Sequence, residues 1–115
     1  PLEDVEQEWL VQWMEMRGYK FSKIPHETYS KGWMQKHKNK RTGVRPGVPD
    51  LIVLIPPRPK PGDKHKLLMI EMKRLQGSTV SKEQKEWIER LNLVDGIEAL
   101  VCKGFEVAKA FILEE

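Results

Sequence analysis

The sequence predicts a mixed α/β fold, in which helices flank a sheet that combines antiparallel and parallel strands. Residues 51–55 and 67–72 are short apolar runs of strand length, rich in aliphatic and β-branched residues. Residues 56–63 connect them and contain four prolines, so this connection cannot form a crossover helix. The two runs are therefore expected to pair as antiparallel neighbours. Helical patterns precede and follow them, which places helices on the faces of the sheet.

Residues 2–17 are expected to form the first helix, which Gly18 ends. Leu10 and Met14 lie beside an apolar stripe at helical spacing, made of Leu2, Val5, Trp9, Trp13 and Met16. Residues 19–24 alternate between apolar and polar side chains and predict a half-exposed strand that ends at Pro25. Residues 26–46 have no clear period and much charge, so we expect an irregular segment with a short helical turn near Trp33.

The C-terminal half continues with a helix, a strand and a last helix. Ser81 is a good N-cap for a helix of residues 82–93. Its buried side is expected to carry Trp87, Ile88 and Leu91. Residues 97–102 predict a core strand, and Gly104 leads into a final helix that includes residues 107–113. The predicted order is helix, three strands, helix, strand, helix.

Length and composition are those of one globular domain spanning residues 1–115, with 39% hydrophobic and 32% charged residues. The longest apolar runs have about five residues, far fewer than the roughly 20 that span a bilayer. The acidic N-terminal residues do not resemble a signal peptide. The single cysteine, Cys102, lies in an apolar run and is expected to be a core thiol, compatible with a reducing compartment. We therefore expect a cytoplasmic protein that does not contact membranes.

Positive charge is concentrated in two segments of the chain, of which residues 58–66 are the shorter and include Asp63. No acidic residue occurs between Glu27 and Asp50, where the basic residues are Lys31, Lys36, Lys38, Lys40, Arg41 and Arg45. The N-terminal helix is acidic by contrast, and this asymmetry favours a polyanionic partner. The alternative is that lysine-rich loops only keep the protein soluble. Because the longer segment leads directly to Asp50, we favour DNA binding by Lys36, Lys38, Lys40, Arg41 and Arg45.

Charged residues stand where the two central strands are otherwise apolar. Asp50 precedes the first strand, and Glu71 and Lys73 close the second, on one face because strand residues two apart project together. Two adjacent carboxylates repel each other and are costly to bury unless a cation lies between them. A divalent metal with a neighbouring lysine fits this pattern, and that combination performs phosphodiester chemistry. The alternative is that Asp50 caps a turn while Glu71 and Lys73 form a solvated strand end.

Mg²⁺ prefers oxygen ligands and keeps several waters, so Asp50 and Glu71 are the expected ligands. The backbone carbonyl of Met72 is a further candidate, and Lys73 would orient the attacking water or stabilise charge at the phosphate. Zinc is disfavoured, since the three histidines occur in unrelated settings and there is one cysteine.

Two further polar residues are candidates for the same site. Glu6 falls near the middle of the apolar stripe, where it either pairs with a basic side chain or turns toward the metal; Glu3, at the edge of the stripe, competes for the second role. Gln84 shares a helix face with Trp87 and Ile88, although a buried glutamine usually satisfies backbone groups.

Three segments together are similar to the virus-type replication-repair nuclease (VRR-NUC) family of the PD-(D/E)xK nuclease superfamily. They are Gly47-Val48-Pro49-Asp50-Leu51, Ile70-Glu71-Met72-Lys73 and Ser81-x-x-Gln84, and the resemblance covers essentially the whole chain. The resemblance implies a restriction-endonuclease-like fold and a nuclease dependent on Mg²⁺ or Mn²⁺. It implies catalytic roles for Asp50, Glu71 and Lys73, a supporting role for Gln84, and a first-helix glutamate as a further acid. The proline-rich connection is not explained by the family pattern.

The chain resembles the small stand-alone members of this family. These are phage or bacterial proteins that act on branched DNA, often as homodimers. The resemblance therefore implies an endonuclease for structured DNA, such as the four-way (Holliday) junction, while flap or linear substrates stay open. Interface candidates are the tryptophan-bearing side of the first helix and residues 91–94. The alternative function is a non-catalytic nucleic-acid-binding module, which the intact Asp50, Glu71 and Lys73 disfavour. The small size of the chain disfavours a sequence-specific restriction enzyme.

Overall fold

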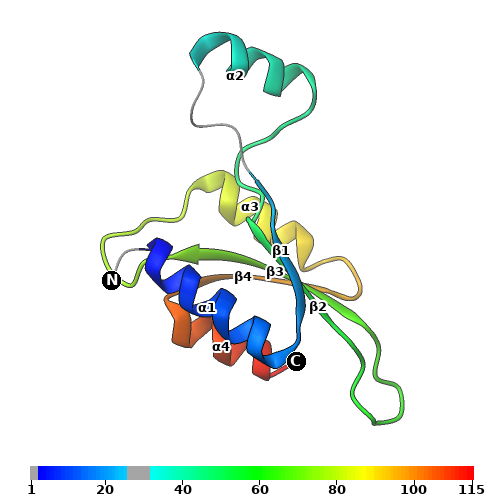
Figure 1. Cartoon of the computed structure of the whole chain (residues 1–115). Helices are drawn as coiled ribbons and strands as arrows, with labels where there is room; N and C mark the ends of the chain where they lie inside the picture. The colour runs from blue at the N-terminus through cyan, green and yellow to red at the C-terminus, as the bar shows by residue number, and fades with distance from the viewer. Residues whose placement is uncertain (1–2, 26–31) are drawn as a thin grey trace.

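A computed structural model of the chain describes residues 3–25 and 32–115, in which four helices surround one four-stranded sheet (Figure 1). The elements are α1 (Glu3–Arg17), β1 (Lys20–Lys23), α2 (Gly32–Arg41), β2 (Leu51–Ile55), β3 (Lys66–Lys73), α3 (Lys82–Leu91), β4 (Ile97–Lys103) and α4 (Phe105–Leu113). None of the helices in these two ranges has the length and apolar character needed to cross a membrane.

The strands lie in the order β1-β2-β3-β4, with antiparallel pairing of β1 to β2 and of β2 to β3. β3 and β4 are parallel and are joined by α3, the one crossover helix among the described strands. Helices α1 and α4 cover one face of the sheet, and α3 lies on the other (Figure 1). The mixed sheet flanked by helices, and the antiparallel pairing across the proline-rich connection, are thus confirmed.

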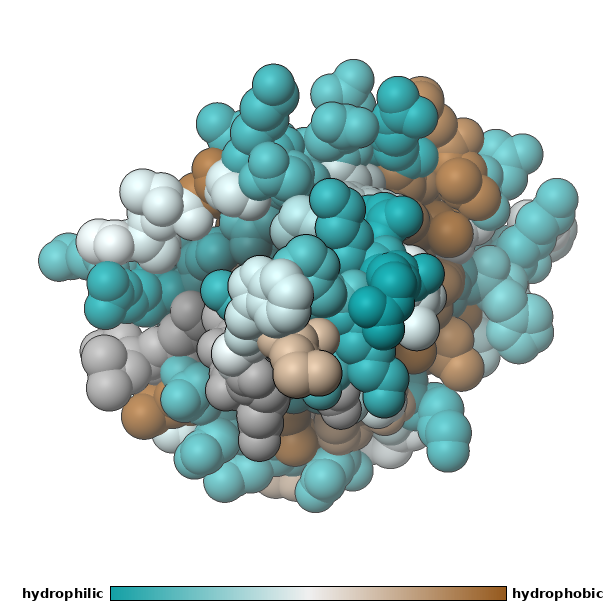
Figure 2. Space-filling model, turned by 90° about the horizontal axis from the view of Figure 1, so that it is seen from above, coloured by the Kyte–Doolittle hydropathy of each residue, from teal (hydrophilic) through white to brown (hydrophobic). Residues whose placement is uncertain are grey.

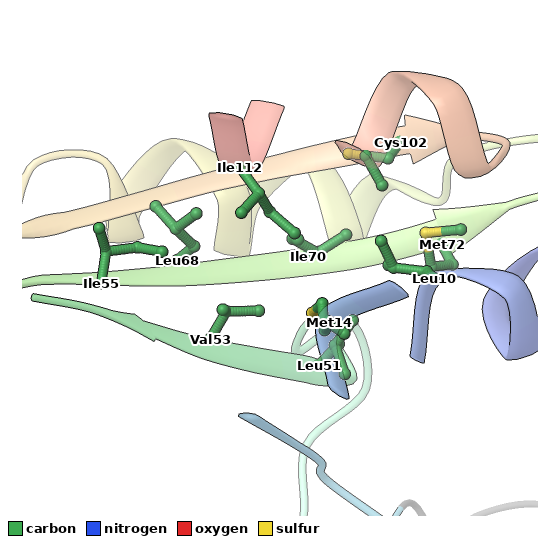
Figure 3. Close-up of a cluster of buried hydrophobic side chains, with 11 residues drawn as sticks. Leu10, Met14, Leu51, Val53, Ile55, Leu68, Ile70, Met72, Cys102 and Ile112 are labelled. Atoms are coloured by element: carbon green, nitrogen blue, oxygen red, sulfur yellow. The ribbon is translucent and has the colours of Figure 1, made fainter. Parts of the chain in front are cut away.

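The core lies between the sheet and the α1–α4 pair (Figure 3). Alternate residues of β2 and β3 project into it, including Leu51, Val53, Leu68 and Ile70, each of which is fully buried. The two helices contribute the fully or almost fully buried side chains Leu10, Met14, Ala108 and Ile112. Burial of aliphatic side chains at about 25 cal/mol per Å² supplies the main stabilisation of this layer.

Helix α1 buries a different face from the one that its apolar stripe predicts. Its buried residues are Glu6, Leu10 and Met14, spaced four apart, whereas Trp9 and Met16 are 45% and 85% exposed. The side chains of Leu10 and Met14, neither of which branches at Cβ, fill the space above the sheet. Trp9 lies at the helix margin, where its ring meets Phe105 edge-on at 6.5 Å between centroids. A large amphipathic ring is accommodated there because part of it stays in contact with water.

The prediction of an irregular segment near Trp33 is wrong for residues 32–41, which form the ten-residue helix α2. Residues 26–31 of that predicted segment lie outside the described residues. Within the described ranges α2 packs against no other helix or strand, and it projects away from the sheet (Figure 1). It has no apolar stripe because it buries no face against the core, so periodicity could not reveal it.

Hydrogen bonds from the residues that follow α2 to its last carbonyl groups end the helix. The Thr42 hydroxyl donates to the carbonyl of Lys38 at 2.8 Å, and the Val44 N–H donates to the carbonyl of Asn39 at 2.8 Å. Basic residues in the last turn interact favourably with the negative end of the helix dipole.

Gly47 fixes the chain between α2 and β2 against the first turn of α3. Its φ is +95°, and a Cβ atom there would lie 2.6 Å from the backbone carbonyl carbon of Glu83. Only glycine permits so close an approach in the left-handed region. Three residues later, the Ile24 N–H donates to the carbonyl of Asp50 at 2.6 Å, which holds the start of β2 beside the end of β1.

Gly47→Ala should lower the free energy of unfolding more than Gly96→Ala does. Gly96 also has a positive φ, +83°, but its nearest atom to a new Cβ, the carbonyl oxygen of His65, is 3.8 Å away. Both substitutions carry a backbone cost of about 1–2 kcal/mol. Gly47→Ala adds a cost of about 1–3 kcal/mol for the displaced backbone of α3. Urea unfolding of the two variants measures the difference, and equal values would contradict the close packing at Gly47.

Candidate active site

The pairing of β2 with β3 brings Asp50 and Glu71 together. Leu51 pairs with Ile70, so the next pair outward along the same antiparallel register is Asp50 with Glu71. Directly opposed residues have Cβ atoms about 4.5–5.5 Å apart and project to the same face. That face is opposite to the one bearing Leu51 and Ile70, so both carboxylates lie on the α3 side of the sheet. The structure therefore places these two predicted residues side by side.

Lys73 completes this cluster from the same strand face. Its Nζ lies 3.8 Å from Oε2 of Glu71, and the two side chains are only 15% and 10% exposed. The Oδ1 atom of Asp50 is also shielded from solvent. The interpretation of Glu71 and Lys73 as a solvated strand end is therefore wrong. Two carboxylates and one ammonium leave an excess of negative charge, and shielding from water strengthens its attraction for a cation.

The backbone carbonyl of Met72 is directed toward the β2 side rather than toward β4. Leu67 N–H donates to Gly96 and Lys73 carbonyl accepts from Gly104, so the alternate residues 67, 69, 71 and 73 bond to β4. The carbonyl of Met72 must then point toward the β2 side, where its register partner is Pro49. Proline has no N–H to donate there. The Met72 side chain is fully buried in the α1–α4 core, and a metal-ligand role for its carbonyl stays a prediction.

Gln84 is half-buried in the first turn of α3, where it forms a reciprocal capping box with Ser81. Gln84 N–H donates to the Ser81 hydroxyl oxygen at 3.1 Å, and Ser81 N–H donates to Oε1 of Gln84 at 3.0 Å. Its side-chain oxygen thus satisfies a helix end, as a buried glutamine commonly does. Its backbone N–H group is also part of the surface that Gly47 contacts. A supporting role in catalysis stays a prediction.

Glu6 has a backbone partner rather than a basic side chain. It is 4% exposed, and its Oε1 accepts from the N–H of Phe105, the first residue of α4, at 2.6 Å. Gly104, the N-cap of α4, has no side chain with which to cap the helix, so Glu6 supplies the acceptor from α1. A carboxylate is favourable there because of the positive end of the helix dipole. A metal-ligand role for Glu6 stays a prediction, and the side chain of Glu3 lies outside the described part of the structure.

The candidate metal site offers two carboxylates, those of Asp50 and Glu71. In residues 3–25 and 32–115, no group of three or more His, Cys, Asp or Glu side chains is placed to hold a metal ion. The register pairs two, Asp50 and Glu71. Mg²⁺ is commonly bound by one or two carboxylates, with waters and substrate phosphate oxygens completing its octahedron. The donor chemistry of the site therefore fits Mg²⁺ or Mn²⁺ in the presence of a phosphate substrate.

Cys102 takes no part in this site. It is fully buried in the core on the α1–α4 side, and burial raises the pKa of its thiol to about 12. The thiol is therefore un-ionised at neutral pH and is neither a nucleophile nor a zinc ligand. Its predicted position in the core is confirmed.

The predicted DNA-binding residues lie on and after α2. All are exposed, namely Lys36, Lys38, Lys40, Arg41 and Arg45. The part of the surface seen from above is largely hydrophilic (Figure 2). Arg45 also donates from Nη1 to the carbonyl of Lys40 at 3.1 Å, which anchors the turn that follows α2. Sequence reasoning missed this contact, as well as the buried Asn39, which accepts a hydrogen bond from Gln35 at 2.8 Å.

Two adjoining hollows connect α2 with α3. The first, of about 430 Å³, is lined by Lys36, Asn39, Lys40, Val44, Arg45 and Pro46. The second, of about 370 Å³, is lined by Arg45, Pro46, Glu83, Glu86, Trp87 and Arg90. Arg45 and Pro46 belong to both, and they immediately precede the Gly47–Asp50 segment. The basic residues 36–45 are therefore linked to the start of β2 by a few residues of the chain.

Comparison with known proteins identifies the family. Residues 2–106 match the model of the VRR-NUC domain. A solved structure described as a VRR_NUC domain protein is 28% identical, with a TM-score of 0.74 over 99% of this chain and 87% of the other. A second, described as a VRR_NUC domain, is 22% identical, shares the fold with a TM-score of 0.63, and covers 96% of this chain and 94% of its own. No curated protein matches the sequence. The chain belongs to the VRR-NUC family and is a nuclease-type domain.

Proposed function

We propose that this protein is an endonuclease that hydrolyses phosphodiester bonds in structured DNA, with Mg²⁺ or Mn²⁺ as cofactor. The observation that carries the proposal is the cluster on the α3 face of the sheet. There Asp50 lies opposite Glu71, and Lys73 lies 3.8 Å from Glu71. Membership of a nuclease family supports the same activity.

The carboxylates of Asp50 and Glu71, with the carbonyl of Met72, are the groups that would hold the metal. When bound, a divalent cation supplies Lewis-acid polarisation of the phosphate and lowers the pKa of water. Glu71 is held on a strand that is hydrogen-bonded on both sides, so its position changes little when charge accumulates at the phosphate. Asp50 is held at the start of β2 by the bond from Ile24 to its carbonyl.

Lys73 has a separate role, because an ammonium donates hydrogen bonds and does not coordinate metals. Glu71, 3.8 Å away, holds it at the site. From this position it would donate to a phosphate oxygen or to the attacking water, and its positive charge would stabilise the additional negative charge of the transition state.

The basic residues of α2 and the turn after it would attract and position the phosphate backbone. A four-way junction has two symmetry-related scissile sites, whereas each chain carries one cluster of this kind among its described residues. Paired cleavage therefore favours a homodimer with a twofold axis. Exposed apolar side chains that suit such an interface are Trp9 and Met16 on α1 and Leu93 and Val94 after α3, which are 45%, 85%, 80% and 50% exposed.

The principal alternative is a non-catalytic nucleic-acid-binding module. A panel of labelled four-way junction, flap and linear DNAs, incubated with Mg²⁺, Mn²⁺ or EDTA, distinguishes the two. The proposal expects metal-dependent products, most abundant with the junction, and none in EDTA. Binding without cleavage in either metal would favour the alternative. The reducing cytoplasm of a bacterial or phage-infected cell is the proposed place of action.

Asp50→Asn and Glu71→Gln should each reduce the cleavage rate by at least about 100-fold, because each removes a metal-binding charge while keeping side-chain volume. Asp50→Asn also removes a repulsion between neighbouring carboxylates, so its free energy of unfolding in EDTA should not fall, whereas Glu71→Gln additionally removes the ion-pair partner of Lys73 and should be the less stable of the two. Single-turnover rates and urea unfolding measure the two effects. Glu106→Gln, an exposed change on α4, is the control and should cleave at the normal rate. Normal cleavage by either site variant would refute the assignment.

Lys73→Ala should lower the saturated cleavage rate with little effect on metal affinity, since Lys73 assists chemistry without coordinating metal. Calorimetric titration with Mn²⁺, beside single-turnover kinetics, separates the two quantities. Lys73→Arg keeps the charge and should retain more activity than Lys73→Ala. A large loss of Mn²⁺ affinity with an unchanged saturated rate would show that the role given to Lys73 is wrong.

Replacing Lys36, Lys38, Lys40 and Arg41 by glutamine should weaken binding to all DNAs and flatten its salt dependence. Each lost phosphate contact reduces the slope of log K against log salt by about 0.9 on duplex DNA. Anisotropy titrations from low to moderate salt, in EDTA, measure this slope. Replacing Lys60 and Lys64 in the β2–β3 connection is the control, and it should leave the slope nearly unchanged. An unaltered slope in the α2 variant would assign these lysines to solubility alone.

A further inference from the structure

Helix α2 carries an exposed aromatic side chain that phosphate binding does not explain. Trp33 is 72% exposed, although tryptophan is usually much more buried than this. It is in the first turn of a helix that contacts no other described helix or strand. The helix is longer than the short turn expected near Trp33, and the ring has no described helix or strand to pack against.

The indole ring has one neighbour on its own helix. The ring of His37, one turn later, lies 4.1 Å from it between centroids, at an interplanar angle of 56°. Residues three and four apart share a helix face, so Trp33 shares its face with Lys36, His37 and Lys40. His37 supports the indole from one side, and the high exposure of Trp33 leaves much of the ring in solvent. An aromatic surface is thus flanked by two ammonium groups.

The charge of the helix determines which partner fits this surface. No acidic residue lies between Glu27 and Asp50, so a second copy of α2 would be repelled. Aromatic rings placed along a positively charged path are the feature by which proteins bind single-stranded nucleic acid, since every base has a face that stacks. In an intact duplex the faces of internal bases are covered by their neighbours. A ring on a projecting helix can therefore stack only on a base that is unpaired or unstacked.

We propose that Trp33 stacks on an unpaired base of the DNA substrate, so that α2 recognises DNA with single-stranded or opened positions. This inference rests on the proposed function and specifies its substrate class. Lys36 and Lys40 hold the adjoining phosphates, and Trp33 distinguishes a branch or single-stranded arm from plain duplex. Asp50, Glu71 and Lys73 are not required for this discrimination.

The test measures binding in EDTA, where cleavage does not occur, with two DNAs. One is a duplex closed by hairpins at both ends, and the other is the same duplex with a single-stranded arm. Trp33→Ala should weaken binding to the armed DNA by about 5- to 100-fold. It should change binding to the closed duplex by less than about 2-fold, and Trp33→Phe should fall between the two. The salt slope should stay the same in Trp33→Ala, because no phosphate contact is lost.

Met34→Ala is the matched control, because Met34 is an apolar, 77% exposed neighbour on the same helix. It should bind both DNAs as the unmodified protein does. Helix content from circular dichroism confirms that the variants fold. Quenching of tryptophan fluorescence by the armed DNA should be largely lost in Trp33→Phe, although Trp9, Trp13 and Trp87 remain.

Three outcomes would overturn the inference. If Trp33→Ala binds the armed DNA normally, or weakens both DNAs equally, stacking is refuted while the nuclease proposal stands. If Trp33→Ala converts a dimer to a monomer in light scattering without changing DNA affinity, the ring contacts a second copy. If the unmodified protein binds neither DNA, both this inference and the proposed function fail.

Discussion

The register between β2 and β3 is the constraint on which the site depends. Leu51 opposite Ile70 and Val53 opposite Leu68 are buried pairs, and their burial selects this register over its neighbours. A slip of one residue would turn every side chain of the strand to the other face. Asp50 would then face the α1–α4 core and lose its position beside Glu71. The hydrophobic energy of the core therefore holds two mutually repelling carboxylates together on the opposite face.

The same core explains why charged residues in β3 are confined to the ends of the strand. β3 is buried along most of its length, and its charged residues occur at its two ends. At the C-terminal end, Gly47 and Gly104 allow neighbouring segments to approach closely. Gly47 contacts α3 through its backbone, whereas Gly104 faces Leu75 and the Glu6 carboxylate that accepts from the N–H of Phe105. The side chains of Glu71 and Lys73 are shielded from water, and the hollow lined by Arg45, Pro46 and Glu83 adjoins the contact between Gly47 and α3.

The sequence predicts well those elements in which a local pattern of apolar side chains indicates which residues are buried. The runs 51–55 and 67–72 and the N-cap at Ser81 depend on neighbours a few residues away. Strand alternation and antiparallel pairing are enough to bring Asp50, Glu71 and Lys73 to one face. Other features depend on distant contacts: the partner of Glu6 is Phe105, far along the chain, and no local pattern indicates it. The predictions of the buried face of α1 and of an irregular segment in place of α2 are wrong for related reasons. The exposed Trp9 and Met16 extend the apolar pattern of α1 beyond its buried face, and a helix without a buried face has no period to detect.

Helix α2 is inserted between two strands that are neighbours in the sheet, and this fixes what it can do. β1 ends at Lys23, which pairs with Leu51, and the next residues outward are tied by the bond from Ile24 N–H to the carbonyl of Asp50. The two ends of the inserted segment therefore meet at Asp50. The ten helical residues span roughly 15 Å, and residues 42–49 connect them to Asp50, so DNA bound at α2 would be tethered to the segment that bears this carboxylate. Because α2 packs against no other described element, its sequence is free to suit a partner instead of the core. Under the proposed function, α2 binds DNA and the carboxylate cluster cleaves it, so the residues of one can change without disturbing the other. Their common attachment at Asp50 would keep the bound strand near the cluster.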